Sequence, residues 1–573
     1  MLGAEFLIFS PVRFGASRRM LRRPEEREVN SRSSAWSILN LALIAILVVV
    51  SCAWGDDAAL QAGLDDLKSS SFATKSGAVA KIAESGATRA HPILQALSGG
   101  LLYLRQDDGV FLIAADDTPT STMSDALSGK DVGALDRDTL KKIGINNQMR
   151  TALGSALARL SLRDPSPAAR KAAIESLYPS LNDETVPLLR DAVEGERDDG
   201  VRAAFATALA LADLDSPNVE QRRAAMAVLG SSLHPEVRNR LEAQLGNDDA
   251  GVPRESDATV RQAATEALQH IDMMRTFFGL FETLFFGLSL GFVLVLAATG
   301  LAITFGVMGV INMAHGELMM LGAYATWLVQ QAMPNHLELS LLAAIPVAFV
   351  VSGLAGIAIE RGVVRFLYGR PLETLLATFG VSLVLQQGVR TVFSPLNRAV
   401  ATPQWMSGQL VLNGALAITY NRLYIILFSI LVFLALVAIL RFTALGLQVR
   451  AVSQNRGMAR AMGVRAGWVD AMTFGLGSGV AGLAGVALSQ LTNVGPNLGQ
   501  SQIVDSFMVV VFGGVGNLWG TLVAGLSLGI ANKFLEPVAG AVLGKIAILV
   551  IIILFIQKRP RGLFALKGRA VEA

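Results

Sequence analysis

The chain has 573 residues, of which 52% are hydrophobic and only 17% are charged, and its mean hydropathy is +0.48. Its formal net charge of +3 gives no indication of nucleic acid binding, and its single cysteine, Cys52, excludes an intramolecular disulfide and a cysteine zinc cluster. Residues 56–275 have the charged, alanine-rich composition of a soluble domain, whereas residues 276–573 contain apolar runs long enough to cross ~30 Å of hydrocarbon. The sequence therefore predicts an all-α protein, in which an exported helical domain precedes a polytopic membrane helical bundle.

Residues 1–55 have the order of a secretory signal peptide or an uncleaved membrane anchor. A basic region precedes an apolar core at Ile38–Val50, and the small residues Ser51, Cys52 and Ala53 follow it. Met20 is an alternative start, and residues 49–52 loosely resemble a lipid-attachment site. Each alternative places residues 56–275 outside the cytoplasm, in the periplasm. The basic residues are Arg18, Arg19, Arg22 and Arg23.

The exported part is predicted to be mostly helical and repetitive. Four segments share an arginine near the helix start, small residues after it and a later leucine, a pattern that resembles HEAT-type repeats. Residues 101–115 break the pattern, because two apolar runs flank Asp107-Asp108-Gly109 and predict a β-hairpin. The domain is either a docking surface for a partner or a solubilising appendage. The segments are 167–177, 200–209, 218–229 and 258–268.

The loops of the membrane half predict its orientation. Loops 360–370 and 441–465 and the tail from Lys558 are rich in arginine or lysine, so the positive-inside rule makes them cytoplasmic. With the exported domain outside, the number of crossings after residue 275 is odd. Segment 503–513 is too short for a full span and precedes a glycine run, which predicts a discontinuous element. The expected spans are 280–305, 309–331, 339–359, 372–392, 423–440, 467–491, 503–513, 518–532 and 537–556.

A polar hexad, residues 312–317, interrupts the apolar sequence. Histidine and glutamate are costly at bilayer depth, so they line a path or hold broken helices together. Asn312 and His315 share a helix face, and Gly309 and Gly316 permit a break or a close helix contact. Two hypotheses stay open here. Either these residues line or gate a translocation path, or His315 and Glu317 form a structural hydrogen-bond pair.

A second polar segment, residues 493–507, carries Asp505 and Ser506 into an apolar run. Gly495, Pro496 and Gly499 predict irregular backbone, which is tolerated at membrane depth where it lines a cavity. The alternative is that Asp505 or Ser506 begins a helix.

The basic segment 450–463, within the loop 441–466, predicts a short amphipathic helix. Its small and apolar residues favour a helix laid into a groove of a partner over a plain basic loop. Gly463 suits the helix end. The residues expected at this docking surface are Arg450, Gln454, Asn455, Arg456, Arg460 and Gly463.

Two repeated strings favour close helix packing over a sequence repeat. GLSLG occurs at 287–291 and 525–529, and GLAG occurs at 353–356 and 482–485. Because the two pairs have different separations, no single repeat unit explains both. Small-residue helix contacts explain the strings more simply.

Several motifs in the correct order resemble the permease of branched-chain amino acid type ABC importers. They are the string 287–324, RPLETLLATFGVSLVLQQ at 370–387, the loop 450–463, and GGVGN followed by the tail KRPRGLF. The resemblance covers about residues 278–567. Within this family RPLETLLATFG, NVGPNLGQSQIVDSFMVVVFGGVGN and NKFLEP, with the long exported extension, most resemble the urea permease branch.

The resemblance implies a multi-pass subunit of the bacterial inner membrane that works with partners. These are a second permease subunit, two ATP-binding subunits docked on the 450–463 loop, and a periplasmic substrate-binding protein. The chain has no P-loop, because Gly544-Lys545 is followed by Ile546, so it is not expected to be an enzyme. No cofactor or metal is expected in this chain, and ATP would be used by the partners.

The cargo implied by the resemblance is urea, with branched-chain amino acids or short amides as the alternative and a passive urea channel less favoured. Urea is small, neutral and polar, so its path needs hydrogen-bond partners and no ion pair. Suitable side chains for the translocation path are Asn312, His315, Glu317, Thr374, Thr378, Gln386, Gln387, Asp505 and Ser506.

Overall fold

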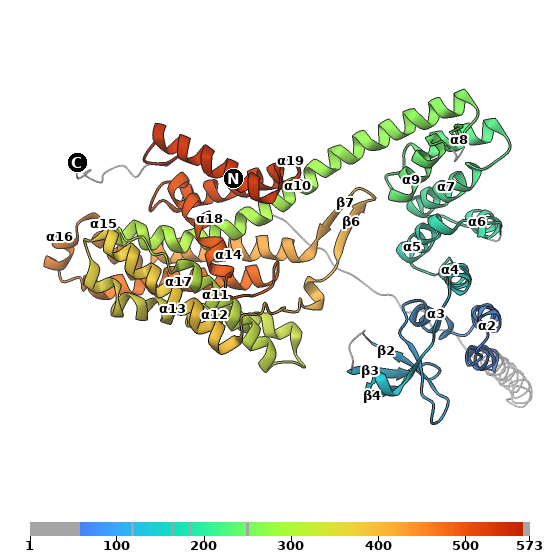
Figure 1. Ribbon diagram of the computed structural model, residues 1–573, viewed down its shortest axis with the longest axis horizontal. Coiled ribbons are helices and arrows are strands. Elements are labelled where there is room, and N and C mark those ends of the chain that lie inside the picture. The colour runs from blue at the N-terminus through green and yellow to red at the C-terminus, as the bar shows by residue number, and fades with distance from the viewer. Residues whose placement is uncertain (1–57, 116–119, 163, 184, 248–250, 565–573) are drawn as a thin grey trace, which may run out of the picture. The chain divides into compact units, whose positions relative to one another are not determined.

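The computed structural model describes residues 58–115, 120–162, 164–183, 185–247 and 251–564 (Figure 1). The predicted signal peptide or anchor at 1–55 lies outside these residues. The chain divides into two compact units, with the division after Ala225. Each unit has its own hydrophobic core, and each is described separately below.

The first unit opens with helices packed beside a β-sheet. Helical residues 58–67, α2 (Phe72–Glu84) and α3 (Ala90–Ser98) supply fully buried leucine and isoleucine side chains to its core. The predicted hairpin at 101–115 is confirmed, because β1 (Leu102–Leu104) pairs antiparallel with β2 (Phe111–Ala114). The hairpin belongs to a larger sheet of order β4-β3-β2-β1-β5, so the all-α prediction is wrong here. The other strands are β3 (Thr120–Asp125), β4 (Asp131–Asp136) and β5 (Lys141–Lys142), with the 3-10 helix η1 (Arg137–Thr139) before β5.

A series of short helices follows the sheet, and all four predicted repeat segments are helical. In three of them the shared arginine folds back onto its own chain. Arg170, Arg222 and Arg261 each donate Nη1 to the carbonyls five and six residues earlier, at 2.8–3.3 Å. In the fourth, Arg202 pairs with Asp199 instead. The helices are α4 (Asn147–Ser161), α5 (Pro167–Leu177), η2 (Tyr178–Ser180), α6 (Thr185–Val193), α7 (Asp199–Asp213), α8 (Val219–Leu229) and α9 (Pro235–Leu245).

One ion pair ties α5 to the segment before α7. Arg170 Nε lies 2.7 Å from Glu196 Oε2, and Nη2 lies 2.9 Å from Oε1. Hydrogen bonding to Arg170 is the main reason that the pKa of Glu196 falls from 4.5 to about 2, and the hydrogen bond from the backbone N–H of Asp198 is the second. A lowered folded-state pKa means that the stabilisation is present above pH 4.5 and is lost as the pH falls toward 2.

We expect Arg170→Met to increase amide exchange at residues 196–198, because the glutamate loses its charged partner. The wild-type protection should fall as the pH is lowered from 4.5 toward 2, and the variant should show a smaller pH effect. Hydrogen exchange of the intact chain in detergent, corrected for the intrinsic rate, measures both. Lys171→Met is the control, since its own contact with Glu175 is long at 3.8 Å. Equal pH profiles for wild type and Arg170→Met would contradict the prediction.

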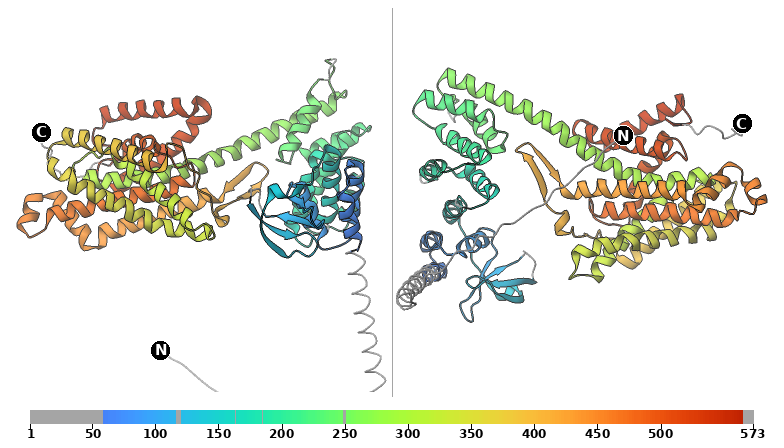
Figure 2. Two further views of the ribbon diagram at one scale, coloured as in Figure 1. Left: turned by 60° about the horizontal axis from the view of Figure 1, so that its bottom comes forward. Right: turned by 180° about the vertical axis from the view of Figure 1, so that it is seen from behind.

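The second unit is dominated by apolar helices. α10 (Ala258–Met308) has 51 residues and a length of ~77 Å, and Figure 2 shows it as one continuous helix. The predicted domain boundary at 275/276 falls inside it. Among the described residues six helices are long and apolar enough to span a membrane. They are α10, α12 (Leu337–Gly362), α13 (Pro371–Phe393), α14 (Tyr420–Phe442), α17 (Ala466–Ser489) and α19 (Leu518–Lys558).

Shorter elements complete the bundle. α11 (His315–Ala332) and α18 (Leu498–Gly513) lie inside it, and the brevity predicted for the 503–513 element is confirmed. α19 contains two helical parts, because Gly540 has φ 77 and Pro537 precedes it. The connections contain η3 (Val364–Leu367), η4 (Gln404–Met406), α15 (Ala444–Gln454), α16 (Arg456–Ala461) and a hairpin of β6 (Gln409–Asn413) and β7 (Leu416–Thr419).

Glycine faces hold the long helices together. α10 packs along α19, and α17 packs along α12. The two GLSLG strings face each other, since a Cβ on Gly529 would overlap the backbone of Gly291 and Gly287. The two GLAG strings lie on α12 and α17, where Gly356 meets Ser478 and Gly482 meets Ser352. The packing interpretation of these strings is therefore confirmed.

The contacts nevertheless repeat in mirrored order. α11 packs on α12 and α17, and α18 packs on α19 and α10. Helices α10, α11 and α12 therefore correspond in order to α17, α18 and α19. Each of these contacts made by one set has a counterpart made by the corresponding helices of the other set. Transporters are often built from such repeats, and here the repeat is in the packing and is not visible as one sequence period.

Two of the three basic loops meet at one end of the bundle. Arg456 from the 441–465 loop hydrogen-bonds the hydroxyl of Tyr368, which follows the 360–367 segment. Near the C-terminus, Phe564 O accepts a hydrogen bond from Asn517 Nδ2 at 3.4 Å. One of the loops predicted to lie on the opposite side, 492–502, contacts a different segment, because Val494 forms an antiparallel β-bridge with Arg398.

Candidate functional site

α11 begins beside Ala297, about three turns before the end of α10 and not at that end. Gly309 ends α10 in the left-handed conformation with φ 68, and residues 309–314 return into the bundle without helical structure. Asn312 Oδ1 accepts the backbone N–H of Ala314 at 3.0 Å, which stabilises the turn before α11. His315 Nε2 then lies 2.8 Å from Ala297 O, near the middle of the buried part of α10.

α18 begins at the same level as α11. The two helix starts touch at Gly316 and Gly499, where a Cβ on either glycine would overlap the carbonyl of the other. The residues before α18, 490–497, are non-helical like residues 309–314. Irregular backbone of this kind is tolerated in an apolar bundle where it is enclosed by protein or lines a cavity. Both helix N-termini, which carry positive partial charge, therefore meet deep inside the bundle.

A polar stripe on α13 runs beside these two helix starts. Its members recur every fourth residue, so they occupy one face of the helix. The opposite face of α13 carries strongly exposed apolar side chains, including Leu372 at 79% and Val384 at 71%. The stripe consists of Thr374, Thr378, Ser382, Gln386 and Arg390.

One half of the stripe contacts the start of α11. The backbone N–H of Met313 donates to Thr378 Oγ1 at 3.1 Å, and Thr378 donates to Thr374 O at 2.8 Å. Ser382 Oγ donates to Glu317 Oε1 at 3.1 Å. The hydroxyls thus stabilise the non-helical segment and the buried carboxyl group of α11.

The other half of the stripe contacts the start of α18. Gln386 Nε2 donates to Gln500 Oε1 at 3.4 Å, and Arg390 Nη2 donates to Asn497 Oδ1 at 2.6 Å. Asn497, Gln500 and the neighbouring Gln387 are exposed. Amide groups are therefore accessible on the side of the bundle where the stripe meets α18.

Of the two hypotheses for the hexad, the hydrogen-bond pair between His315 and Glu317 is wrong. His315 binds α10 and Glu317 binds α13, so each side chain attaches the start of α11 to a different helix. Both are buried, at 0% and 1% exposure. His315 Nδ1, Glu317 Oε2 and Asn312 Nδ2 have no hydrogen-bond partner among the described protein atoms.

Asp505 and Ser506 do not begin a helix, because α18 starts at Leu498. Asp505 Oδ2 instead lies 2.7 Å from Lys545 Nζ on the second part of α19. Ser506 is fully buried and donates to Gln502 O at 2.9 Å within its own helix. The structure therefore separates these two residues from the α13 stripe.

The predicted docking loop forms two short helices, α15 and α16. Asn455 ends the first and caps the second, its Oδ1 accepting the N–H of Met458 at 2.9 Å. Gly463 closes the segment with φ 88. Arg450, Gln454 and Arg460 are exposed, as are Met458 at 60% and Met462 at 77%. Arg456 differs from the other predicted docking residues, because its side chain points inward.

Sequence reasoning missed Ser382, Arg390, Asn497, Gln500 and Lys545. The four-residue spacing from Thr374 would have found Ser382 and Arg390, and would have left out Gln387, which lies beside the stripe. The partners on α18 and α19 come from distant sequence, and no local pattern indicates them.

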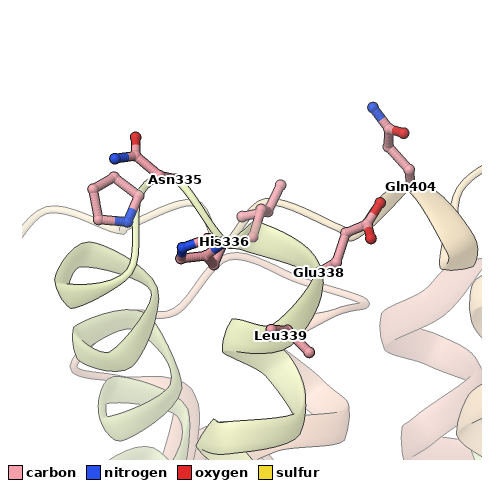
Figure 3. Close-up of a pocket in the computed structure, with 7 residues that line it drawn as sticks. Asn335, His336, Glu338, Leu339 and Gln404 are labelled. Atoms are coloured by element: carbon pink, nitrogen blue, oxygen red, sulfur yellow. The ribbon is translucent and has the colours of Figure 1, made fainter.

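A small cavity of about 320 Å³ lies at the connection between α11 and α12 (Figure 3). It is lined by residues 334–339 and Gln404, with His336 and Glu338 as its ionisable groups. It is formed by loops at the end of the helices and does not reach the α13 stripe. In the part of the chain that the structure describes, no group of three or more His, Cys, Asp or Glu could hold a metal ion.

The apolar half of the chain matches a known family of transport proteins. Residues 283–556 match the family described as "Branched-chain amino acid transport system / permease component". The chain is 30% identical over 301 residues to the high-affinity branched-chain amino acid transport system permease protein LivH of Escherichia coli (strain K12), which covers 51% of this chain and 97% of that protein. The chain belongs to this permease family.

A second relative supports the same assignment. The high-affinity branched-chain amino acid transport system permease protein BraD of Pseudomonas aeruginosa is 29% identical over 286 residues, with 48% of this chain and 93% of that protein covered. The chain is thus the permease component of a branched-chain amino acid type ABC importer, and such a component is not itself an enzyme. The family match begins at residue 283, so it does not extend to the sheet and short helices of residues 58–245.

Proposed function

We propose that this permease forms one wall of an ATP-driven translocation path, and that the α13 stripe and the starts of α11 and α18 line it. The meeting of two helix N-termini at Gly316 and Gly499, inside an apolar bundle, is the observation that carries this proposal. Half-helix N-termini at bilayer depth are where transporters bind polar or anionic cargo. The exposed amides of Gln387, Asn497 and Gln500 extend this surface toward a second permease subunit.

We propose a branched-chain amino acid as the cargo. Its carboxylate suits the positive ends of α11 and α18 and the guanidinium of Arg390, which lies beside α18 at Asn497. The relatives named above are branched-chain amino acid permeases, which favours the same cargo. The apolar surroundings of the helix starts suit an aliphatic side chain.

Arg390→Gln should reduce leucine uptake about 10- to 100-fold, because a charge-assisted hydrogen bond contributes ~1.5–3 kcal/mol. Glutamine keeps an N–H donor but no charge, and its amide ends two bonds short of the Nη2 atom that contacts Asn497. Uptake of labelled leucine, normalised to the permease in the membrane fraction, measures the effect. Arg441→Gln, on the exposed end of α14, is the matched control. Leucine uptake unchanged by Arg390→Gln would contradict the carboxylate assignment.

Urea is the second candidate cargo, favoured by the strings RPLETLLATFG and NKFLEP and by the exposed amides. Urea has no carboxylate, so Arg390→Gln should leave its uptake within about twofold. Labelled urea and labelled leucine are therefore tested in parallel, in cells with and without this gene. If only urea uptake requires the gene, the cargo is urea; if neither does, the proposed path is wrong.

We further propose that α15 and α16 dock on ATP-binding subunits. Exposed Met458 and Met462 offer an apolar contact, and Arg450, Gln454 and Arg460 surround it with polar groups. The basic loops at this end favour the cytoplasm. The opposite end then faces the periplasm, where a substrate-binding protein delivers cargo. The exported helices, which we interpret as HEAT-like repeats, suit docking of a partner on that side.

A further inference from the structure

Arg456 connects three elements at the basic end of the bundle. It lies at the start of α16, and its two Nη atoms contact the carboxylate of Asp470 on α17, with Nη1 at 3.2 Å from Oδ1. Nη1 also donates to the hydroxyl of Tyr368, which follows η3. The guanidinium carbon lies 3.9 Å from the centre of the Tyr368 ring. A single side chain thus binds α17 and the α12–α13 connection to α16.

The partners of Arg456 are held firmly in place. The side chain of Asp470 is only 2% exposed, and that of Arg456 is 26% exposed. Burial, with Asp470 nearby, raises the pKa of Tyr368 to about 12, so its hydroxyl stays neutral. Glu360, the last buried carboxyl group of α12, lies 3.6 Å from Arg361 and faces the same cluster. The arginine is therefore the cation that balances Asp470.

The helices fixed by this contact lead to the path. α17 packs on α12 through Gly356 and Ser478, and Gly482 of α17 touches Gly322 of α11. Close-packed helices transmit a displacement as rigid bodies, because their interfaces have no free volume to absorb it. A movement of α16 that is passed to α17 would therefore reach α11 and its start at His315.

We propose that Arg456 is a positioning residue, which clamps the α15–α16 element to α17 and to the α12–α13 connection so that the two move as one unit. The proposal rests on the docking role proposed above, and it adds that Arg456 acts inside the permease and not on the partner. A bidentate guanidinium contact fixes both distance and orientation. Lysine cannot reproduce it, because an ammonium group is a single point of contact.

The test uses the complete importer, purified through a tag on this chain and reconstituted in liposomes with its binding protein. Arg456→Lys and Asp470→Asn should co-purify with the ATP-hydrolysing partners as wild type does, because the exposed docking surface is unchanged. Cargo transported per ATP hydrolysed should fall about tenfold. The exchanged pair Arg456→Asp with Asp470→Arg should recover a large part of that ratio. Arg465→Lys, exposed and near the cluster, is the control.

Each outcome is decisive. An assembled Arg456→Lys complex with a wild-type ratio of cargo to ATP would overturn the clamp, as would an exchanged pair that is no better than the single variants. Loss of co-purification in Arg456→Lys, with Arg465→Lys intact, would place Arg456 on the docking surface and overturn the positioning role. If the wild-type chain brings down no ATP-hydrolysing subunit, the proposed docking function itself fails, whatever Arg456 does.

Discussion

Gly499→Ala should prevent the transport-competent fold from forming. The added methyl group would overlap the backbone of Gly316 and Glu317, and neither helix start can withdraw without breaking the contacts of His315 and Glu317. Overpacking against backbone costs about 3 kcal/mol or more, because no side chain can rotate away. We expect little protein in the membrane fraction, a lowered unfolding midpoint in detergent and no uptake of cargo.

Gly279→Ala is the matched control for this variant. Gly279 lies in α10, and a Cβ added there meets nothing within 4 Å. Alanine is favoured over glycine inside a helix by about 1 kcal/mol, so this variant should be as stable as wild type or slightly more stable. A Gly499→Ala protein with wild-type melting and uptake would show that the two helix starts are not in contact.

Lys545→Leu should lower the stability of the bundle. It leaves the carboxylate of Asp505, whose side chain is only 9% exposed, without its partner in an apolar bundle. Because the Lys545 side chain is itself 48% exposed, removing it costs less than breaking a fully buried pair, about 1–3 kcal/mol. We expect a lower unfolding midpoint in detergent and a smaller yield of folded protein.

The double variant Asp505→Leu with Lys545→Leu tests whether the ion pair only stabilises the bundle or also takes part in transport. Replacing both charges by apolar groups is close to neutral, so the unfolding midpoint should return to near the wild-type value. Because Asp505 faces α19 and not the α13 stripe, uptake should return as well. A stable double variant without uptake would contradict this and return Asp505 to the translocation path.

The sequence by itself determined which parts of this protein are apolar, charged or irregular. Each predicted span is occupied by helix, because runs of ~20 apolar residues satisfy their backbone only in that way. Residues 309–314, at the start of the second span, and residues 490–491, at the end of the sixth, are non-helical, and Gly540 interrupts the last span. The hairpin at 101–115 and the short element before residue 513 were also predictable, since turn residues and run length are local properties.

The tertiary structure alone decided what the polar residues do. His315 and Glu317 were expected to bind each other or line a path, yet each attaches α11 to a different helix. Arg456 was expected on the docking surface, and it turns inward to Asp470. The physical reason is that a buried polar group must find a partner, and that partner comes from whichever distant helix packs beside it. Sequence spacing fixes the face of one helix, whereas the neighbour on that face is set by how the whole bundle packs.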